Sequence, residues 1–261
     1  GKTLVGIAAS EHLRVAPVWI GPARTRININ REFSQWGAAT PQFYSFASAH
    51  KLLEQPDTLP HLLIIDEAHE IKNPDTKRYE VVQRLADVIR KCHGNHAHVL
   101  LLSGTPSPKL PSEWWSLCEV ACPGFLREGS QQQLTQRLAI TEVVDYGAGP
   151  VNRVIGWDET EVAFMRDRLA GLVLSQFKSD HLPELPDKTY RRVNLKPSPD
   201  VAKLARAVVA NCETVIEGLT KLRQLSDGFL YEHTPAGRVT HQIDCPKDQA
   251  LIDSLEENEH V

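Results

Sequence analysis

The chain has 261 residues, of which 41% are hydrophobic and 24% are charged, as is typical of soluble globular proteins. No stretch approaches the roughly 18 consecutive apolar residues that span a bilayer, and no signal-peptide pattern opens the chain, so we expect no membrane partner. The formal net charge of −4 gives no overall basic signature for nucleic acid, although a local groove can be basic on an acidic protein.

Three apolar segments in the first half of the chain predict buried strands, at residues 15–20, 62–65 and 98–102. A helical pattern follows the first of them, from Arg24 to Trp36. Another follows the second strand, begins at capping residues 73–76 and continues to about Lys91. Strand, helix and strand over this length form a βαβ unit, so the second and third strands should be parallel and neighbouring or nearly so. We therefore expect an α/β fold with a doubly wound parallel sheet.

After Pro123-Gly124 the chain changes to a polar stretch, several helical patterns and one short strand. The helical patterns run at residues 158–177, at 198–226 and from 246 onward. The strand is predicted at 189–195, after a break that contains two prolines. We therefore expect three regions: a first lobe at 1–126, a helical linking region at 127–186, and the start of a truncated second lobe with a helical insertion at 187–261.

Cysteine and histidine usage favours a reducing environment without a metal centre. The five cysteines are odd in number and irregularly spaced, which argues against a disulfide framework and suits a cytoplasmic location. Cys92, His93, His96 and His98 lie close together, but their spacing is not a standard zinc pattern. A solvated loop is therefore the preferred interpretation of that segment.

Two carboxylates, Asp66 and Glu67, follow the second predicted strand at once. In open α/β sheets the carboxyl ends of the strands line the ligand crevice. There, Asp66 is expected to hold Mg²⁺, directly or through water, and Glu67 to polarise an attacking water molecule as a general base. The alternative is an ordinary pair of solvated acids at the end of a strand.

Two further segments carry residues suited to phosphate chemistry. The chain starts with Gly1-Lys2-Thr3, which matches the last three residues of a phosphate-binding loop, where the Lys reaches the β- and γ-phosphates and the Thr coordinates the metal. By itself so short a match also occurs by chance. Ser103-Gly104-Thr105-Pro106 ends the third strand with small hydroxyl residues, which could bridge the phosphate end of the crevice to the far side of the lobe or form a plain turn.

In this order, the segments at 1–3, 66–69 and 103–106 resemble motifs I, II and III of superfamily 2 helicases. The flanking sequence resembles the Swi/Snf-type DNA translocases of that superfamily. The segments that carry this resemblance are Ala68 to Asn73, Glu113 to Leu117 followed by Pro123-Gly124, Lys178 ahead of Leu185-Pro186, and Leu222-Arg223-Gln224. The last of them continues into Gly228-Phe229 and Tyr231, as in bacterial and phage members. The resemblance covers essentially the whole chain.

The resemblance implies a RecA-like P-loop lobe, then helical insertions and the start of a second RecA-like lobe. It also implies a motor that uses ATP and Mg²⁺ to move along double-stranded DNA, usually without separating the strands. By position, Gly1, Lys2 and Thr3 would bind the nucleotide, with Thr3 and Asp66 holding Mg²⁺ and Glu67 acting on water.

The resemblance further implies a link between the nucleotide site and DNA. His69 would couple the two sites, helped by the segment Ser103-Gly104-Thr105. Gly21-Pro22 matches the place of motif Ia, which touches the DNA backbone. Contacts of that kind go to phosphates, so they would not specify sequence.

The chain departs from the family pattern at a few places. Ile29 stands where the family often has Trp, and the Arg that is frequent near Gln176 is missing; neither change affects catalysis. The glycines of motif I would lie before Gly1, and motifs V and VI, which supply arginine fingers, would lie after Val261. Because an arginine finger contributes on the order of 10³-fold or more to phosphoryl transfer, we expect a fragment that hydrolyses ATP poorly by itself.

Two alternative functions stay open at this point. A strand-separating helicase or a restriction-type motor subunit belongs to the same superfamily, but Trp114-Trp115 and Leu222-Arg223-Gln224 argue against it. A non-hydrolysing DNA-binding scaffold would keep the lobe without a working motor. The intact set of Lys2, Asp66 and Glu67 argues against that reading, because a scaffold has no chemical need of all three.

Overall fold

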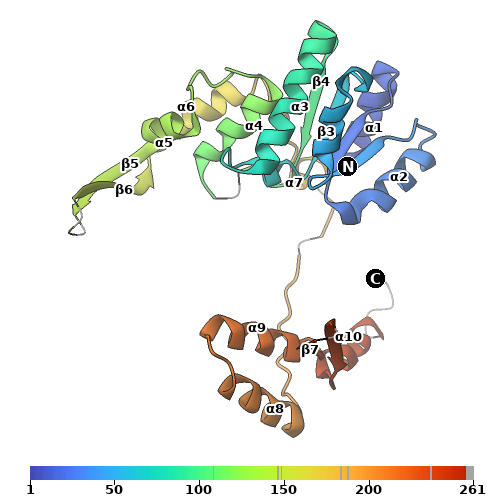
Figure 1. The fold of residues 1–261 in the computed structure, drawn as a ribbon, viewed down its shortest axis with the longest axis vertical. Coiled ribbons are helices and arrows are strands. Elements are labelled where there is room, and N and C mark those ends of the chain that lie inside the picture. The colour runs from blue at the N-terminus through green and yellow to red at the C-terminus, as the bar shows by residue number, and fades with distance from the viewer. Residues whose placement is uncertain are drawn as a thin grey trace. The chain divides into compact units, whose positions relative to one another are not determined.

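The computed structural model describes residues 1–107, 109–145, 147, 149–182, 184–186, 188–235 and 237–256. Its internal contacts divide the chain into two units, Gly1–Gln176 and Phe177–Val261 (Figure 1). The division falls inside the stretch 127–186 that the sequence predicts to be a linking region. Among the described residues, no helix combines the length and the apolar character needed to cross a membrane.

A four-stranded parallel sheet lies at the centre of the first unit, in the order β2-β1-β3-β4. Its strands are β1 (Val18–Gly21), β2 (Gln42–Ser45), β3 (Leu62–Asp66) and β4 (His98–Leu102). The predicted parallel pairing of the second and third apolar segments is confirmed, since β3 pairs with β4 over its whole length. The chain leaves β1 toward β2 on one side and returns as β3 on the other. The carboxyl ends of β1 and β3 therefore form the switch point at which such sheets bind ligands.

Helices cover both faces of this sheet, because the strands are apolar on both sides. On one face, Val18, Ile20, Leu63 and Ile65 pack in a core with α3 (Lys77–His93) and α4 (Trp114–Ala121). On the other face, Trp19, Leu62 and Ile64 pack with α1 (Lys2–Leu13) and α2 (Arg26–Gln35). Figure 1 shows the two helix pairs on either side of the strands. The expected doubly wound α/β fold is confirmed.

Close packing of α1 on the sheet depends on Gly6. A Cβ atom at this position would lie 2.6 Å from Cζ3 of Trp19 and 3.3 Å from Cδ1 of Ile64. The Trp19 side chain is fully buried and meets Phe33 edge-on, with ring centroids 5.7 Å apart. Glycine thus lets the helix that begins at Lys2 lie directly against the sheet.

The first unit continues with α5 (Gln131–Leu138), the hairpin β5 (Ala139–Asp145) and β6 (Pro150–Trp157), and α6 (Glu159–Leu169). α4, α5 and α6 enclose a third core that includes Leu126, Leu134 and Met165. The hairpin projects from these helices in Figure 1 and was not predicted from the sequence. The helix predicted to reach residue 177 ends at Leu169, where turn hydrogen bonds close the chain around Gly171.

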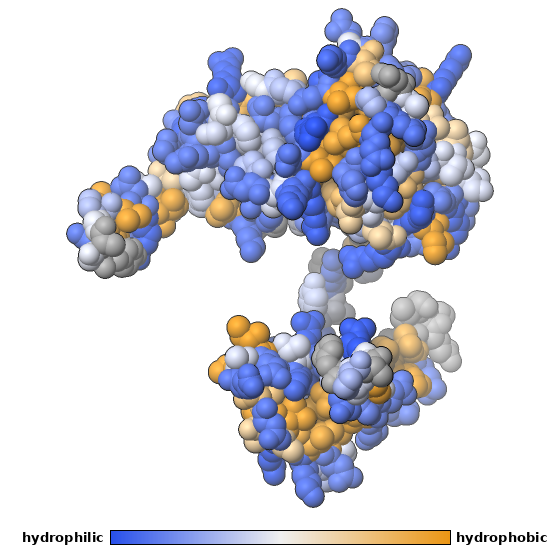
Figure 2. Space-filling view, in the orientation of Figure 1, coloured by the Kyte–Doolittle hydropathy of each residue, from blue (hydrophilic) through white to orange (hydrophobic). Residues whose placement is uncertain are grey.

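The second unit contains helices and one hairpin. Its elements are α7 (Lys178–His181), α8 (Pro199–Ala210), α9 (Val215–Ser226), β7 (Phe229–Thr234), β8 (Gly237–Gln242) and α10 (Pro246–Glu256). The helical pattern predicted at 198–226 is two helices, because Thr214 starts a new one by accepting a hydrogen bond from the N–H of Glu217. The strand predicted at 189–195 is wrong, since those residues join no sheet. Figure 2 shows hydrophobic side chains gathered over this unit, and Val215 and Ile216 are among the most exposed.

Candidate active site

A chain of polar contacts joins three segments at the carboxyl end of the sheet. Lys2 Nζ lies 3.0 Å from Glu67 Oε1, across 65 residues of sequence. The other carboxylate oxygen of Glu67 lies 3.3 Å from His69 Nδ1. That same ring nitrogen lies 3.4 Å from Ser103 Oγ. The structure thus brings together the start of α1, the end of β3 and the end of β4, as expected for side chains that follow parallel strands.

Asp66 is the last residue of β3 and one of the few buried charged residues in the described chain, with 8% of its surface exposed. Burial raises the pKa of its carboxyl above the usual value, and the nearby carboxylates of Glu67 and Glu32 raise it further. The backbone N–H of Glu67 donates to Asp66 Oδ1 at 3.0 Å, and this bond, with the charge of Lys2, opposes the rise. A buried acid at this point favours a cationic partner.

Glu67 leaves the strand in a left-handed backbone conformation, with φ 52° and ψ 51°. This conformation costs a residue other than glycine roughly 1–2 kcal/mol. It turns the chain sharply at the crevice, and the Glu67 side chain meets both Lys2 and His69. Strain of this kind is often kept at functional positions.

The residues predicted to form motif Ia lie beside Asp66. Gly21 is buried at the end of β1, and a Cβ atom there would lie 3.3 Å from Cβ of Asp66. Glycine therefore permits the close approach of β1 and β3 at their carboxyl ends. Pro22 follows, and its carbonyl accepts a hydrogen bond from Thr25 Oγ1 at 2.8 Å. Pro22 takes no part in the polar contacts around Glu67.

The other predicted site residues surround Lys2 and Ser103. Gly1 is the exposed N-cap residue of α1, and Thr3 is half-buried in the first turn of that helix. A Cβ atom on Gly104 would lie 3.9 Å from Lys2 Nζ, so the loop after β4 reaches the start of α1. The backbone N–H of Thr105 donates to Ser103 Oγ at 3.2 Å, which fixes the hydroxyl that faces His69.

The sequence reasoning missed two residues at this site. The indole Nε1 of Trp19 is buried without a hydrogen-bond partner among the described residues, 3.5 Å from the point where a Cβ of Gly21 would lie. Glu32 contributes negative charge at Asp66. A tryptophan in an apolar strand and an acid on a helix surface carry no sequence signal of such a location.

The histidine-rich segment lies at the opposite end of the strands, before β3 and β4. The ring of His61 lies 5.9 Å from that of His93 and 6.2 Å from that of His98, centroid to centroid. Burial lowers the pKa of His61, and the neighbouring histidines lower it further. Within the described ranges, no group of three or more histidine, cysteine or acidic side chains is arranged to hold a metal ion.

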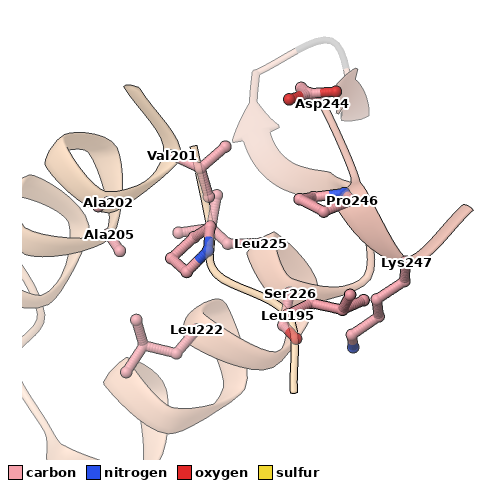
Figure 3. Close-up of a pocket in the computed structure, with 11 residues that line it drawn as sticks. Leu195, Val201, Ala202, Ala205, Leu222, Leu225, Ser226, Asp244, Pro246 and Lys247 are labelled. Atoms are coloured by element: carbon pink, nitrogen blue, oxygen red, sulfur yellow. The ribbon is translucent and has the colours of Figure 1, made fainter. Parts of the chain in front are cut away.

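A cavity of about 230 Å³ lies in the second unit, between α8, α9 and the chain around Pro246 (Figure 3). Its walls are mainly apolar and include Leu195, Val201 and Leu222. Lys247 at its edge pairs with Asp227 at 2.8 Å. This cavity presents no set of groups comparable with that around Glu67.

Comparison with known proteins identifies the family. A model described as the SNF2-related domain matches residues 44–223, which is more than half of the chain. The chain belongs to the SNF2-related domain family. Its SNF2-related part includes β3 and β4, and so covers Asp66, Glu67, His69 and Ser103.

Curated relatives of this SNF2-related chain are much longer proteins. It is 30% identical over 127 residues to the SNF2 domain-containing protein ENL1 of Oryza sativa subsp. japonica, a match that covers 49% of this chain and 12% of that protein. It is 23% identical over 280 residues to the SWI/SNF-related matrix-associated actin-dependent regulator of chromatin subfamily A-like protein 1 of Xenopus tropicalis. That second match covers 95% of this chain and 27% of the relative.

A solved structure supports the SNF2-related fold. The Sulfolobus solfataricus SWI2/SNF2 ATPase core, determined in complex with double-stranded DNA, matches with a TM-score of 0.50 and 21% identity. The match covers 87% of this chain and 52% of that one, so the chain spans about half of the ATPase core. At this level of identity the likeness concerns the fold, and it agrees with the parallel RecA-like sheet of the first unit.

Proposed function

We propose that this protein is an ATP-dependent motor that hydrolyses ATP to move along double-stranded DNA. The observation that carries the proposal is the chain of contacts from Lys2 through Glu67 and His69 to Ser103 at the switch point of the sheet. In these contacts Lys2 is a cation that can bind phosphate, Glu67 is an acid that can activate water, and His69 links Glu67 to the loop after β4. Membership of the SNF2-related domain family supports the same activity.

The residues divide the work of hydrolysis by position. Lys2 binds the phosphates at the start of α1, where the helix N-terminus also favours an anion. Glu67 accepts a proton from the water that attacks the terminal phosphorus, as the bond to the leaving diphosphate breaks. His69 holds one oxygen of Glu67 and faces Ser103 with the same nitrogen. The orientation of the proposed base therefore depends on the loop after β4.

The residues present fit a nucleotide-bound Mg²⁺. One oxygen of the Asp66 carboxyl accepts the Glu67 N–H, and the other has no hydrogen-bond partner within the described part of the chain, so it can take a ligand. Thr3 supplies a hydroxyl next to Lys2 in the same helical turn. Magnesium sites of this kind use one or two protein carboxylates together with substrate phosphates, not an all-protein cage. When bound, the metal neutralises charge on the phosphates.

DNA is proposed to lie against the loop after β1. Gly21-Pro22 opens that loop, and the exposed side chains of Arg24 and Arg26 follow it. Arginine at a helix start is suited to backbone phosphates, which carry no sequence information. The Sulfolobus relative was solved with double-stranded DNA, which supports a duplex as the track.

Replacement of Glu67 tests the hydrolytic part of this proposal. In the complete protein, Glu67→Gln should lower DNA-stimulated ATP turnover by about 10²–10⁴-fold, the usual contribution of a general base, while ATP binding is retained. Glu70→Gln is a matched control, because Glu70 lies in the same turn and pairs with Arg78 on the surface. Unchanged turnover in Glu67→Gln, beside an active wild type, would show that Glu67 is not the base.

A second measurement separates the motor from its two alternatives. A translocase should displace a third strand from a DNA triplex without releasing either strand of the duplex. A strand-separating helicase would release a labelled duplex strand instead. A wild-type protein that binds DNA but turns over no ATP would support the scaffold and contradict the motor.

A further inference from the structure

A second buried acid lies outside the site described above. Apart from Asp66, Glu113 is the only charged residue in the buried part of the described chain, and its side chain is 8% exposed. It belongs to the turn that leads into α4. A buried carboxylate is unfavourable unless it is paired and hydrogen-bonded, so the partners of Glu113 indicate its role.

The partners of Glu113 come from two different loops. Oε1 of Glu113 accepts from Lys72 Nζ at 2.8 Å, and Oε2 accepts from the backbone N–H of Lys109 at 3.2 Å. Lys72 closes the turn that contains His69, three residues earlier. Lys109 lies on the loop that begins at Ser103, after β4. The Glu113 carboxylate therefore joins the two loops at Lys72 and Lys109. The same two loops also meet each other at the contact between His69 and Ser103.

The backbone at Lys72 is held in place independently of this ion pair. Its carbonyl accepts from Ser116 Oγ at 2.9 Å and from Gln131 Nε2 at 3.2 Å, which ties the turn to α4 and α5. Removal of the charge on Glu113 would therefore leave the turn at Lys72 attached to α4 and α5. What would be lost is the link between the turn and the loop that carries Lys109.

We propose that Glu113 is a positioning residue that sets how strongly DNA stimulates ATP turnover. It holds the turn of His69 and the loop of Ser103 to one rigid point, so a shift of either loop changes the geometry of both. Such a shared anchor is the kind of packed contact through which one site biases another. This inference rests on the proposed motor function.

The test uses the complete protein and compares Glu113→Gln with wild type. The amide still accepts from the Lys109 N–H but no longer pairs with Lys72. We expect DNA-stimulated turnover to fall about tenfold, within the range over which such contacts alter coupling, while the KM for ATP stays within about twofold. Glu119→Gln in α4 is the control, since the Glu119 carboxylate accepts from the N–H of Gly124 and this variant should keep wild-type stimulation.

A second variant keeps the proposal testable if Glu113→Gln does not fold. Lys72→Gln breaks the same ion pair from its more accessible end, where the lysine side chain is 24% exposed, and should lower stimulation in the same direction. Wild-type stimulation in either folded variant overturns the positioning role and leaves the motor intact. A wild-type protein without DNA-stimulated ATPase activity overturns both. A rise in the KM for ATP together with a fall in the melting temperature would mark Glu113 as merely structural and would overturn the positioning role.

Discussion

The contact between α1 and the sheet gives a sharp test of the fold. In most helices Gly→Ala stabilises a protein by up to about 1 kcal/mol, because alanine is the better helix former. At Gly6 the new methyl group would lie 2.6 Å from Cζ3 and 3.0 Å from Cη2 of Trp19, well inside van der Waals contact. Trp19 is fully buried and cannot swing away. Overpacking of this kind costs about 1–3 kcal/mol, so we expect Gly6→Ala to lower the free energy of unfolding.

A double-mutant cycle isolates the crowding from helix propensity. Trp19→Phe removes both ring atoms that the methyl group would meet. Gly6→Ala should therefore be neutral or stabilising in the Trp19→Phe background, with a coupling energy of about 1–3 kcal/mol between the two sites. Urea unfolding followed by circular dichroism measures each variant. Equal stabilisation by Gly6→Ala in both backgrounds would refute the close packing of α1 on Trp19.

Two further predictions follow from buried ionisable groups. Burial raises the pKa of Asp66 above its ordinary value of 3.8, so ionised Asp66 destabilises the fold. Asp66→Asn should raise the free energy of unfolding at pH 7 by about 0.5–2 kcal/mol. This gain should vanish as the pH falls below the ordinary pKa of the aspartate, because the carboxyl is then protonated in both the folded and the unfolded state. A gain of equal size at every pH would contradict the raised pKa of Asp66. Burial also raises the pKa of the Cys118 thiol to about 12, whereas Cys92 and Cys122 are exposed. A maleimide at pH 8 should label the two exposed cysteines and spare Cys118 until the protein is denatured. Rapid labelling of Cys118 in the folded state would show that α4 is not packed as described.

The parts of the fold that the sequence predicts are those with strong local patterns. β3 and β4 are apolar runs paired in parallel, and the helix between them has a Thr76 side chain that accepts from the N–H of Tyr79 and a glycine, Gly94, at its end. β2 was missed because it has only four residues, of which Phe43 alone is buried. The hairpin of β5 and β6 was missed because most of its residues are exposed, and the burial of β6 does not alternate along the strand.

The strand wrongly predicted at 189–195 has a strong local pattern but no partner strand among the described residues. Its alternating side chains suit a sheet, but a strand also needs a neighbour to satisfy its backbone groups, and a local pattern does not supply one. The positions of Asp66 and Glu67 were predictable, because residues that follow parallel strands share one edge. The left-handed turn at Glu67 and the buried indole of Trp19 were not, since both depend on how distant segments pack.

The ion pair between Lys2 and Glu67 has a consequence for ligand affinity. In this structure the cation expected to meet a phosphate is already neutralised by a carboxylate from the same chain. That carboxylate behaves as a tethered competitor, whose effective concentration is on the order of millimolar or higher. We therefore expect a dilute monovalent anion to displace it poorly, and a polyphosphate with several charges to displace it and free Glu67. On the proposed function, entry of the ligand and release of the base would be a single exchange.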